Sequence, residues 1–149
     1  MMDINPEVKK RISKVLDSQR IAVLGTSNNN EPYSCLVGFA ISDDFRELVF
    51  ATMRQRLKYK NMVANPRVTL MIDDRDSQAS DFNDTTSITI VGSAQDMEEP
   101  QREKYASMLL HRHPALTEFV NSEDCAIMRV TIDKIYLVSE FESVVKLGV

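Results

Sequence analysis

Three cations alternate along one short stretch of the chain, at Arg54, Arg56 and Lys58, directly after an apolar run that ends in Thr52. Arginine presents a planar fork of donors that matches phosphate oxygens, and lysine presents a point charge. Threonine adds a hydroxyl, and the backbone amides of a following helix-like segment attract anions. The spacing predicts a pocket for a phosphate dianion at the end of a strand. A solvated basic turn without a ligand is the alternative that spacing alone leaves open.

The composition indicates one compact domain over residues 1–149. Apolar residues make up 43% of the chain and charged residues 27%, which is ordinary for a globular protein. The formal charge of −4 argues against nucleic acid as a partner. No apolar run approaches the roughly 18 residues that span a bilayer, and no secretory pattern begins the chain. The two cysteines show no metal or disulfide spacing, so a cytoplasmic location is the simplest interpretation.

The elements that must position the cations are mostly strands. Periodicity predicts an N-terminal helix at about 6–18, a short helix at 57–64 and a helical insertion at about 99–120 that is broken at Pro114. Strands are expected at 21–26, 33–41, 47–52, 67–73, 86–97, 125–132 and 134–141. Short strands joined by tight turns predict a mainly β fold, a closed or partly closed antiparallel barrel.

The segment Val49–Leu70 resembles the phosphate-binding region of the pyridoxamine-phosphate-oxidase-like, FMN-binding split-barrel superfamily. Members carry a strand that ends in threonine, a lysine six positions on, and an Asn-Pro-Arg-Val start to the next strand. Here these features are Thr52, Lys58 and residues 65–68, and the likeness covers most of the chain. The resemblance implies a six-stranded antiparallel Greek-key split barrel with FMN on its outer surface. It also implies a homodimer that holds the cofactor between two subunits.

The resemblance assigns several residues to the phosphate end of an FMN site. Lys58 matches the phosphate lysine of the family, and Thr52 matches the threonine that ends the preceding strand. Arg56 stands where related oxidases have a small hydroxyl residue, and its guanidinium would offer a bidentate pair in that place. Arg54 lies two positions away, where it either shares the same dianion or points to solvent.

The strand that follows the isoalloxazine edge in relatives matches Cys35, Leu36, Val37 and Gly38, whose backbone groups would do most of the recognition. Gly38 has no Cβ, so it either admits a flat ring or marks a bend in the strand. The oxidases have an arginine where this chain has Cys35. The corresponding charge contact is therefore missing or is supplied from elsewhere.

Other residues near the expected site have weaker assignments. Arg75 is a candidate to supply the missing charge, although the carboxylates around it favour a local ion-pair cluster. Ser87 matches a family position that often carries a glutamine in contact with the flavin. The two histidines, His111 and His113, do not converge on a metal and indicate a solvated helix end.

The function that the resemblance implies is an FMN-dependent oxidoreductase, such as a flavin reductase, that acts on an unidentified small molecule and is reduced by a nicotinamide donor. The chain does not carry the C-terminal arginine and histidine that hold pyridoxal phosphate in the true oxidases, so that oxidation is not expected. The alternatives are a deazaflavin-dependent reductase of the same superfamily, a non-catalytic FMN-binding protein, and a barrel without a ligand. The mutual repulsion of an empty cation cluster argues against the last.

Overall fold

The computed structural model describes residues 5–75, 85–139 and 143–149. The strands are β1 (Ile21–Asn28), β2 (Glu31–Gly38), β3 (Ala40–Ile41), β4 (Glu47–Met53), β5 (Arg67–Asp73), β6 (Ser87–Asp96), β7 (Cys125–Ser139) and β8 (Ser143–Gly148). The helices are α1 (Pro6–Ser18), α2 (Leu57–Ala64), α3 (Gln101–Arg112), the 3-10 turn η2 (Pro114–Leu116) and α4 (Thr117–Val120).

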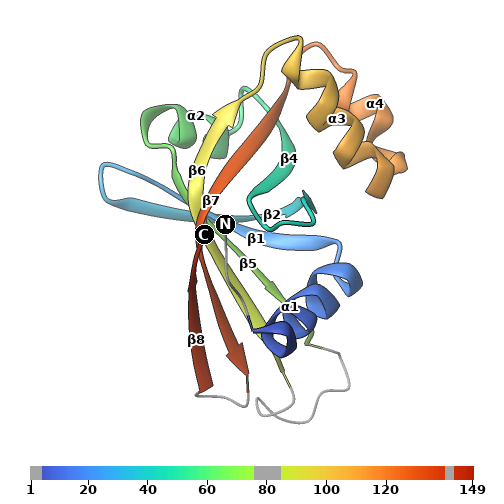
Figure 1. Cartoon of the computed structure of the whole chain (residues 1–149). Coiled ribbons are helices and arrows are strands. Elements are labelled where there is room, and N and C mark those ends of the chain that lie inside the picture. The colour runs from blue at the N-terminus through green and yellow to red at the C-terminus, as the bar shows by residue number, and fades with distance from the viewer. Residues whose placement is uncertain (1–4, 76–84, 140–142) are drawn as a thin grey trace.

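All the strands join one curled antiparallel sheet in the order β2-β1-β5-β6-β7-β4-β3, with β8 added beside β7 (Figure 1). The predicted mainly β, partly closed antiparallel barrel is confirmed. The described residues form eight strands, whereas the resemblance implied six. The expected strand at 33–41 breaks at Phe39, the two expected closing strands form the continuous β7, and Ser143–Gly148 adds an edge strand. Residues 140–141 of the last expected strand lie outside the described residues.

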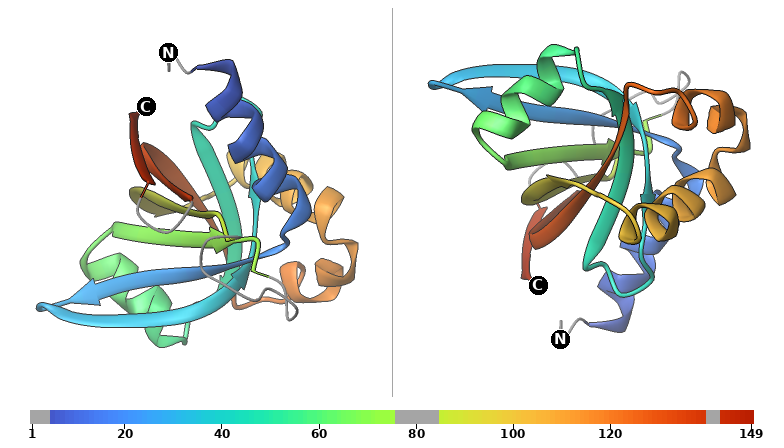
Figure 2. Two further views of the ribbon diagram at one scale, coloured as in Figure 1. Left: turned by 90° about the horizontal axis from the view of Figure 1, so that it is seen from below. Right: turned by 90° about the horizontal axis from the view of Figure 1, so that it is seen from above.

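The break at Phe39 closes the sheet on itself. Gly38 pairs with Ile21 in β1, whereas Ala40 pairs with Val49 in β4. One residue therefore carries the chain from one edge of the sheet to the other, and the views in Figure 2 show the resulting curl. The Phe39 side chain is fully buried inside it. As a result, β2 comes to lie beside the end of β4.

Strand β4 and the first part of β7 are buried on both faces, which explains their apolar runs. Leu48 and Phe50 of β4 point into the barrel interior, where the larger core lies. Val49 points outward and packs with Leu109 of α3 and Ile127 of β7 in a second core beneath the helices. The helical insertion expected at about 99–120 therefore covers the outer face of β4 and β7 (Figure 1).

The N-terminal helix has the bounds that the sequence predicts. The side chain of Asn5 accepts a hydrogen bond from the Glu7 N–H, and proline occupies the first helical position. Ile12, Val15 and Leu16 are buried, and α1 packs against β5 and β6. In the described part of the chain, no helix combines the length and the apolar character needed to cross a membrane.

A close approach between β6 and β7 makes Gly92 a sensitive position. Gly92 lies at a register shift between the two strands, and a Cβ there would meet the Thr131 carbonyl oxygen at 2.2 Å. We expect Gly92→Ala to lower the free energy of unfolding by about 1–3 kcal/mol, because the backbone of β7 must move. Urea titration followed by circular dichroism measures the change. In the control Gly148→Ala, a Cβ meets nothing within 4 Å, so equal losses in both variants would contradict this account.

Candidate functional site

A pocket of about 540 Å³ lies where the end of β4 meets the start of α2, with β2, η2 and α4 completing its walls. This volume falls in the range of roughly 300–1,000 Å³ that is usual for small-molecule sites. Six residues that the sequence assigns to the FMN site line the pocket: Leu36, Val37, Gly38, Thr52, Arg56 and Lys58. The fold therefore brings together residues from two strands and one helix that the resemblance grouped on a single ligand.

The turn between β4 and α2 presents the two pocket cations. The Arg56 N–H donates to the Met53 carbonyl at 3.2 Å, and the Arg56 carbonyl accepts from the Tyr59 N–H at 3.1 Å. Arg56 is the N-cap residue of α2, and its side chain forms no capping bond within the described structure. Arg56 is exposed and lines the pocket. Lys58 follows in the first turn of the helix and is half-buried.

The charged side chains that line the pocket are all positive. Arg56 and Lys58 contribute two positive charges, and none of the described residues that line the pocket is acidic. The chain as a whole carries a formal charge of −4, so this local excess of positive charge runs against the overall balance. Guanidinium and ammonium groups that lack a carboxylate partner favour an anionic ligand.

Thr52 forms part of the pocket wall, but its donor is already engaged. Its backbone is held opposite Ala126 in β7, and its side chain is fully buried. The Thr52 hydroxyl donates to the Met53 carbonyl at 3.2 Å. In this arrangement the hydroxyl does not donate a hydrogen bond to a ligand.

Cys35 lies just outside the pocket lining, next to Lys58. Burial raises the pKa of the Cys35 thiol, and the charge and hydrogen bond of Lys58 act in the opposite direction. The Lys58 ammonium therefore lies close to the Cys35 thiol. Position 35 thus borders Lys58 in this chain, although Cys35 itself brings no charge.

Arg54 turns away from the pocket. Its Nε donates to Asp96 Oδ2 at 3.2 Å, and the Tyr59 hydroxyl donates to the same oxygen at 2.8 Å. Burial alone would lower the pKa of Arg54, but the hydrogen bond and charge of Asp96 outweigh it and raise that pKa. Arg54 thus neither shares the pocket nor points freely to solvent, and with Tyr59 it fastens the start of α2 to the end of β6.

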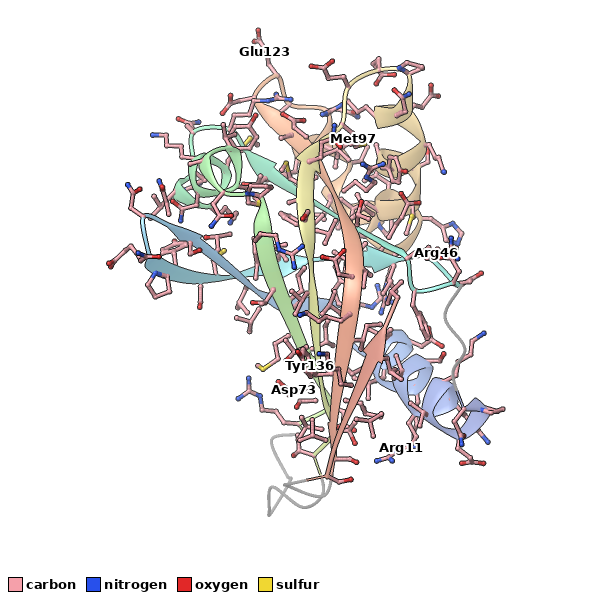
Figure 3. The ribbon with its side chains drawn as sticks, turned by 60° about the vertical axis from the view of Figure 1, so that its left-hand side comes forward. Arg11, Arg46, Asp73, Met97, Glu123 and Tyr136 are labelled. Carbon is pink, nitrogen blue, oxygen red and sulfur yellow. The ribbon has the colours of Figure 1, made fainter. Side chains whose placement is uncertain are left out.

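Arg75 and Ser87 lie away from the pocket. Arg75 pairs with Asp73 at 3.1 Å, just beyond the end of β5, as the local ion-pair interpretation expects. Ser87 pairs with Asp73 across β5 and β6. Figure 3 shows Asp73 and Met97 near opposite ends of the sheet, and β6 runs between them. Neither Arg75 nor Ser87 lines the pocket, and residues 76–84 of the expected polar loop lie outside the described residues.

The interpretation of His113 as part of a solvated helix end is wrong. His113 is half-buried, and its Nε2 is 2.8 Å from the Phe39 carbonyl oxygen. A Cβ on Gly38 would lie 3.4 Å from the nearest atom of the His113 ring, so the imidazole packs directly over Gly38. No local pattern indicates this contact, because Phe39 and His113 are far apart along the chain.

Other lining residues were not predicted from the sequence. Three of them alternate along the chain with the cations: Met53, Gln55 and Leu57. The turn that presents the cations therefore also places these three residues at the pocket. Leu116 and Phe119 come from η2 and α4, beyond the break at Pro114. No local pattern in the sequence shows that this segment turns back toward β4.

The position of Lys58 beside Cys35 can be tested by thiol chemistry. We expect Cys35 to react with iodoacetamide more slowly than a solvated cysteine at pH 8, because burial raises its pKa. Lys58→Met should slow the reaction further, since the loss of the ammonium lets the thiol pKa rise again. Mass spectrometry of the modified peptide gives the rate, and the exposed Lys60→Met is the control. Equal rates in wild type and Lys58→Met would contradict the contact.

Comparison with known proteins places the chain in a family. Residues 8–139 match the family model described as pyridoxamine 5'-phosphate oxidase. The comparison with curated proteins gives no match. A heme binding protein from Mycobacterium smegmatis superposes with a TM-score of 0.83 at 13% identity, over 98% of this chain and 60% of that one. This chain therefore spans less than two thirds of the mycobacterial protein.

Two further solved structures are covered over nearly their whole length. General Stress Protein 26 from Bacillus anthracis superposes with a TM-score of 0.68 at 22% identity, over 95% of this chain and 99% of that one. A FAD-binding protein from Mesorhizobium loti gives a TM-score of 0.69 at 20% identity, over 86% and 91% of the two chains. These structures share the fold, and the family model matches most of the sequence. The chain belongs to the pyridoxamine 5'-phosphate oxidase family.

Proposed function

We propose that this protein binds FMN in the pocket between β2, β4 and α2 and acts as a flavin-dependent oxidoreductase on an unidentified small molecule. The observation that carries the proposal is the division of the pocket lining. Arg56 and Lys58 supply two positive charges, the rest of the lining is largely apolar, and no described lining residue is acidic. FMN joins a phosphate dianion to a large flat ring, and these walls suit both parts. Membership of the family supports the same assignment.

Arg56 and Lys58 differ from Arg54 because they are available to bind an anion. Arg54 is neutralised by Asp96, whereas none of the ion pairs among the described residues involves Arg56 or Lys58. Arg56 can hold two phosphate oxygens through its fork, and Lys58 can add a point charge from the first turn of α2. The donor set therefore fits a phosphate dianion.

The residues of the chain bind and orient, while the redox chemistry belongs to the cofactor. When bound, FMN supplies a ring that accepts a hydride and returns two electrons to a substrate. Arg56 and Lys58 would hold the phosphate tail, and the backbone of Leu36, Val37 and Gly38 borders the space left for the ring. The apolar lining would exclude water. A nicotinamide is the proposed hydride donor, itself oxidised in the transfer.

Two alternatives stay within the same site. A deazaflavin cofactor offers the same phosphate and a similar flat ring, so it would use the same cations. A non-catalytic FMN-binding protein would hold the ring without access for a substrate. Absorption spectra distinguish the two cofactors, and reduction of the bound cofactor by a nicotinamide distinguishes an enzyme from a storage protein.

We also propose that the protein is a homodimer that covers this pocket. Exposed apolar side chains gather at the pocket, with Leu36 66% exposed, Leu57 52% and Tyr33 39%. Apolar residues exposed around a cavity are typical of an interaction surface, and two-fold dimers are the commonest oligomers. Burial of these side chains against a second copy would remove them from water.

The phosphate assignment predicts the behaviour of a double variant. We expect the wild type to bind FMN at one per subunit by visible absorption, and Arg56→Ala with Lys58→Ala to weaken binding at least about a hundredfold through the loss of two charged donors. Its circular dichroism should be unchanged because both side chains lie outside the core. The control Lys10→Ala with Lys60→Ala removes the same charge from exposed positions. Equal affinity in the two double variants would remove the assignment.

The dimer has its own test. Light scattering coupled to gel filtration should give a dimer for the wild type and a monomer for Leu36→Asp, because a carboxylate would have to be buried in the interface. Val144→Asp, at a site on β8 that is 59% exposed, should remain a dimer. A monomeric wild type would refute the dimer and leave the cofactor proposal to the spectra.

A further inference from the structure

A second cavity, of about 380 Å³, lies between the end of β6, strand β7 and the start of α3. Figure 3 shows Met97 just past the end of β6, on the side where α3 begins. The volume is within the range that is usual for small-molecule sites. None of its lining residues belongs to the pocket beside α2. Five polar residues and one methionine line it: Gln95, Asp96, Met97, Glu98, Gln101 and Arg129.

The Arg129 side chain lies where the outer face of the sheet meets α3. Arg129 pairs with Val49 of β4 on one side and with Gln95 of β6 on the other. Because paired residues point to the same face and Val49 belongs to the outer core, Arg129 faces outward as well. Its guanidinium carbon is 5.8 Å from the centroid of the Tyr105 ring in α3. Strand pairing and this ring therefore hold the guanidinium beside the helix.

Most donors of Arg129 have no hydrogen-bond partner within the described residues. Its Nη2 donates to Gln95 Oε1 at 2.8 Å. Its Nη1 is 3.7 Å from Glu47 Oε2, too far for a hydrogen bond, and that oxygen already accepts from the Tyr105 hydroxyl at 2.7 Å. Its Nε is buried without a partner, which is costly for a charged group. Since 26% of the side chain is exposed, a ligand in the cavity can reach it.

The two carboxylates that line the cavity differ in what already binds them. Asp96 accepts hydrogen bonds from Arg54 and Tyr59, so both of its oxygens are engaged. Glu98 is exposed, and none of the ion pairs among the described residues involves it. The cavity thus combines one carboxylate that is available to a cation with one guanidinium that is available to an anion.

A ligand with a single charge suits only half of this arrangement. A simple carboxylate would pair with Arg129 but would be repelled by Glu98, and a simple amine would meet the opposite problem. A small molecule that carries both a carboxylate and an ammonium group satisfies both side chains. Gln95 and Gln101 add amide groups, which can donate to one end of such a ligand and accept from the other.

We propose that this cavity binds a free amino acid, whose carboxylate pairs with Arg129 and whose ammonium group pairs with Glu98. The planar fork of Arg129 matches the two oxygens of a carboxylate. The site is built from β6, β7 and α3 and does not include Arg56 or Lys58. It is therefore independent of the proposed FMN site.

Matched pairs of small molecules test the two charges separately. L-Alanine differs from propionate by its ammonium group, as 4-aminobutyrate differs from butyrate, and the two amino acids differ in the span between their charges. Each compound is titrated into the full chain, and the Arg129 Nε–H signal in ¹H–¹⁵N NMR spectra gives its dissociation constant. We expect at least one amino acid to bind about three- to fivefold more tightly than its matched acid.

Variants of the two charged residues assign the preference. Glu98→Gln should abolish the preference for the amino acid, because the carboxylate that pairs with the ammonium group is gone. Arg129→Met should weaken amino-acid binding at least about tenfold, followed through the Gln101 side-chain amide. Glu103→Gln, at an exposed position of α3 that does not line the cavity, is the control and should bind as the wild type does.

The other outcomes also decide the proposal. Equal affinity for acid and amino acid in both pairs, or a preference that survives Glu98→Gln, would overturn it. So would the absence of any change in the Arg129 signal with all four compounds. If Arg129→Met does not fold, the comparison with the exposed Glu98→Gln decides alone. The variant Arg56→Ala with Lys58→Ala should bind amino acids as the wild type does, so a failure of the FMN proposal would leave this site standing.

Discussion

The curl of the sheet depends on the chain leaving β2 and entering β3 through a single buried residue, Phe39. Its ring fills the barrel interior, with the Arg112 guanidinium 5.1 Å from the ring centroid. Both polar groups of its backbone have hydrogen-bond partners. The Phe39 N–H donates to the Arg20 carbonyl, and the Phe39 carbonyl oxygen lies within hydrogen-bond distance of His113 Nε2. Because this junction joins the two edges of the sheet, β2 lies beside the end of β4. The pocket exists only through that arrangement.

The helix that carries the pocket cations is held by polar contacts rather than by a large apolar face. Tyr59 donates to Asp96 at the end of β6, and Asn61 donates to the Thr26 hydroxyl at 3.0 Å in a buried contact. Buried hydrogen bonds of this kind are directional, so they fix the rotation of α2 as well as its position. Lys58, which directly precedes Tyr59 in α2, is thereby held at the pocket, where it is half-buried.

Local signals in the sequence predicted the helices and strands around the site. Contacts between residues that are far apart in the chain were not predicted. Helix α2 and strand β5 have the predicted bounds because the segment before Asn65-Pro66 carries its own stop signal. The break at Phe39 was missed, since the residues around it are apolar and suit a continuous strand. The pairing of Arg54 with Asp96 and the approach of Phe119 depend on tertiary packing. The grouping of Arg56 with Lys58 came from the spacing of the cations, and the resemblance supported it.

The pairing of β4 with β7 has a consequence for how the protein acquires its site during synthesis. Glu47 pairs with Thr131, and Met53 at the pocket pairs with Cys125, so these strands meet only after most of the chain has been made. Closing such long loops is entropically costly, and topologies of this kind fold slowly. A nascent chain on the ribosome can already hold the cation-bearing turn. It cannot form the pocket until β7 has emerged, so the pocket belongs to the folded chain and not to the nascent one.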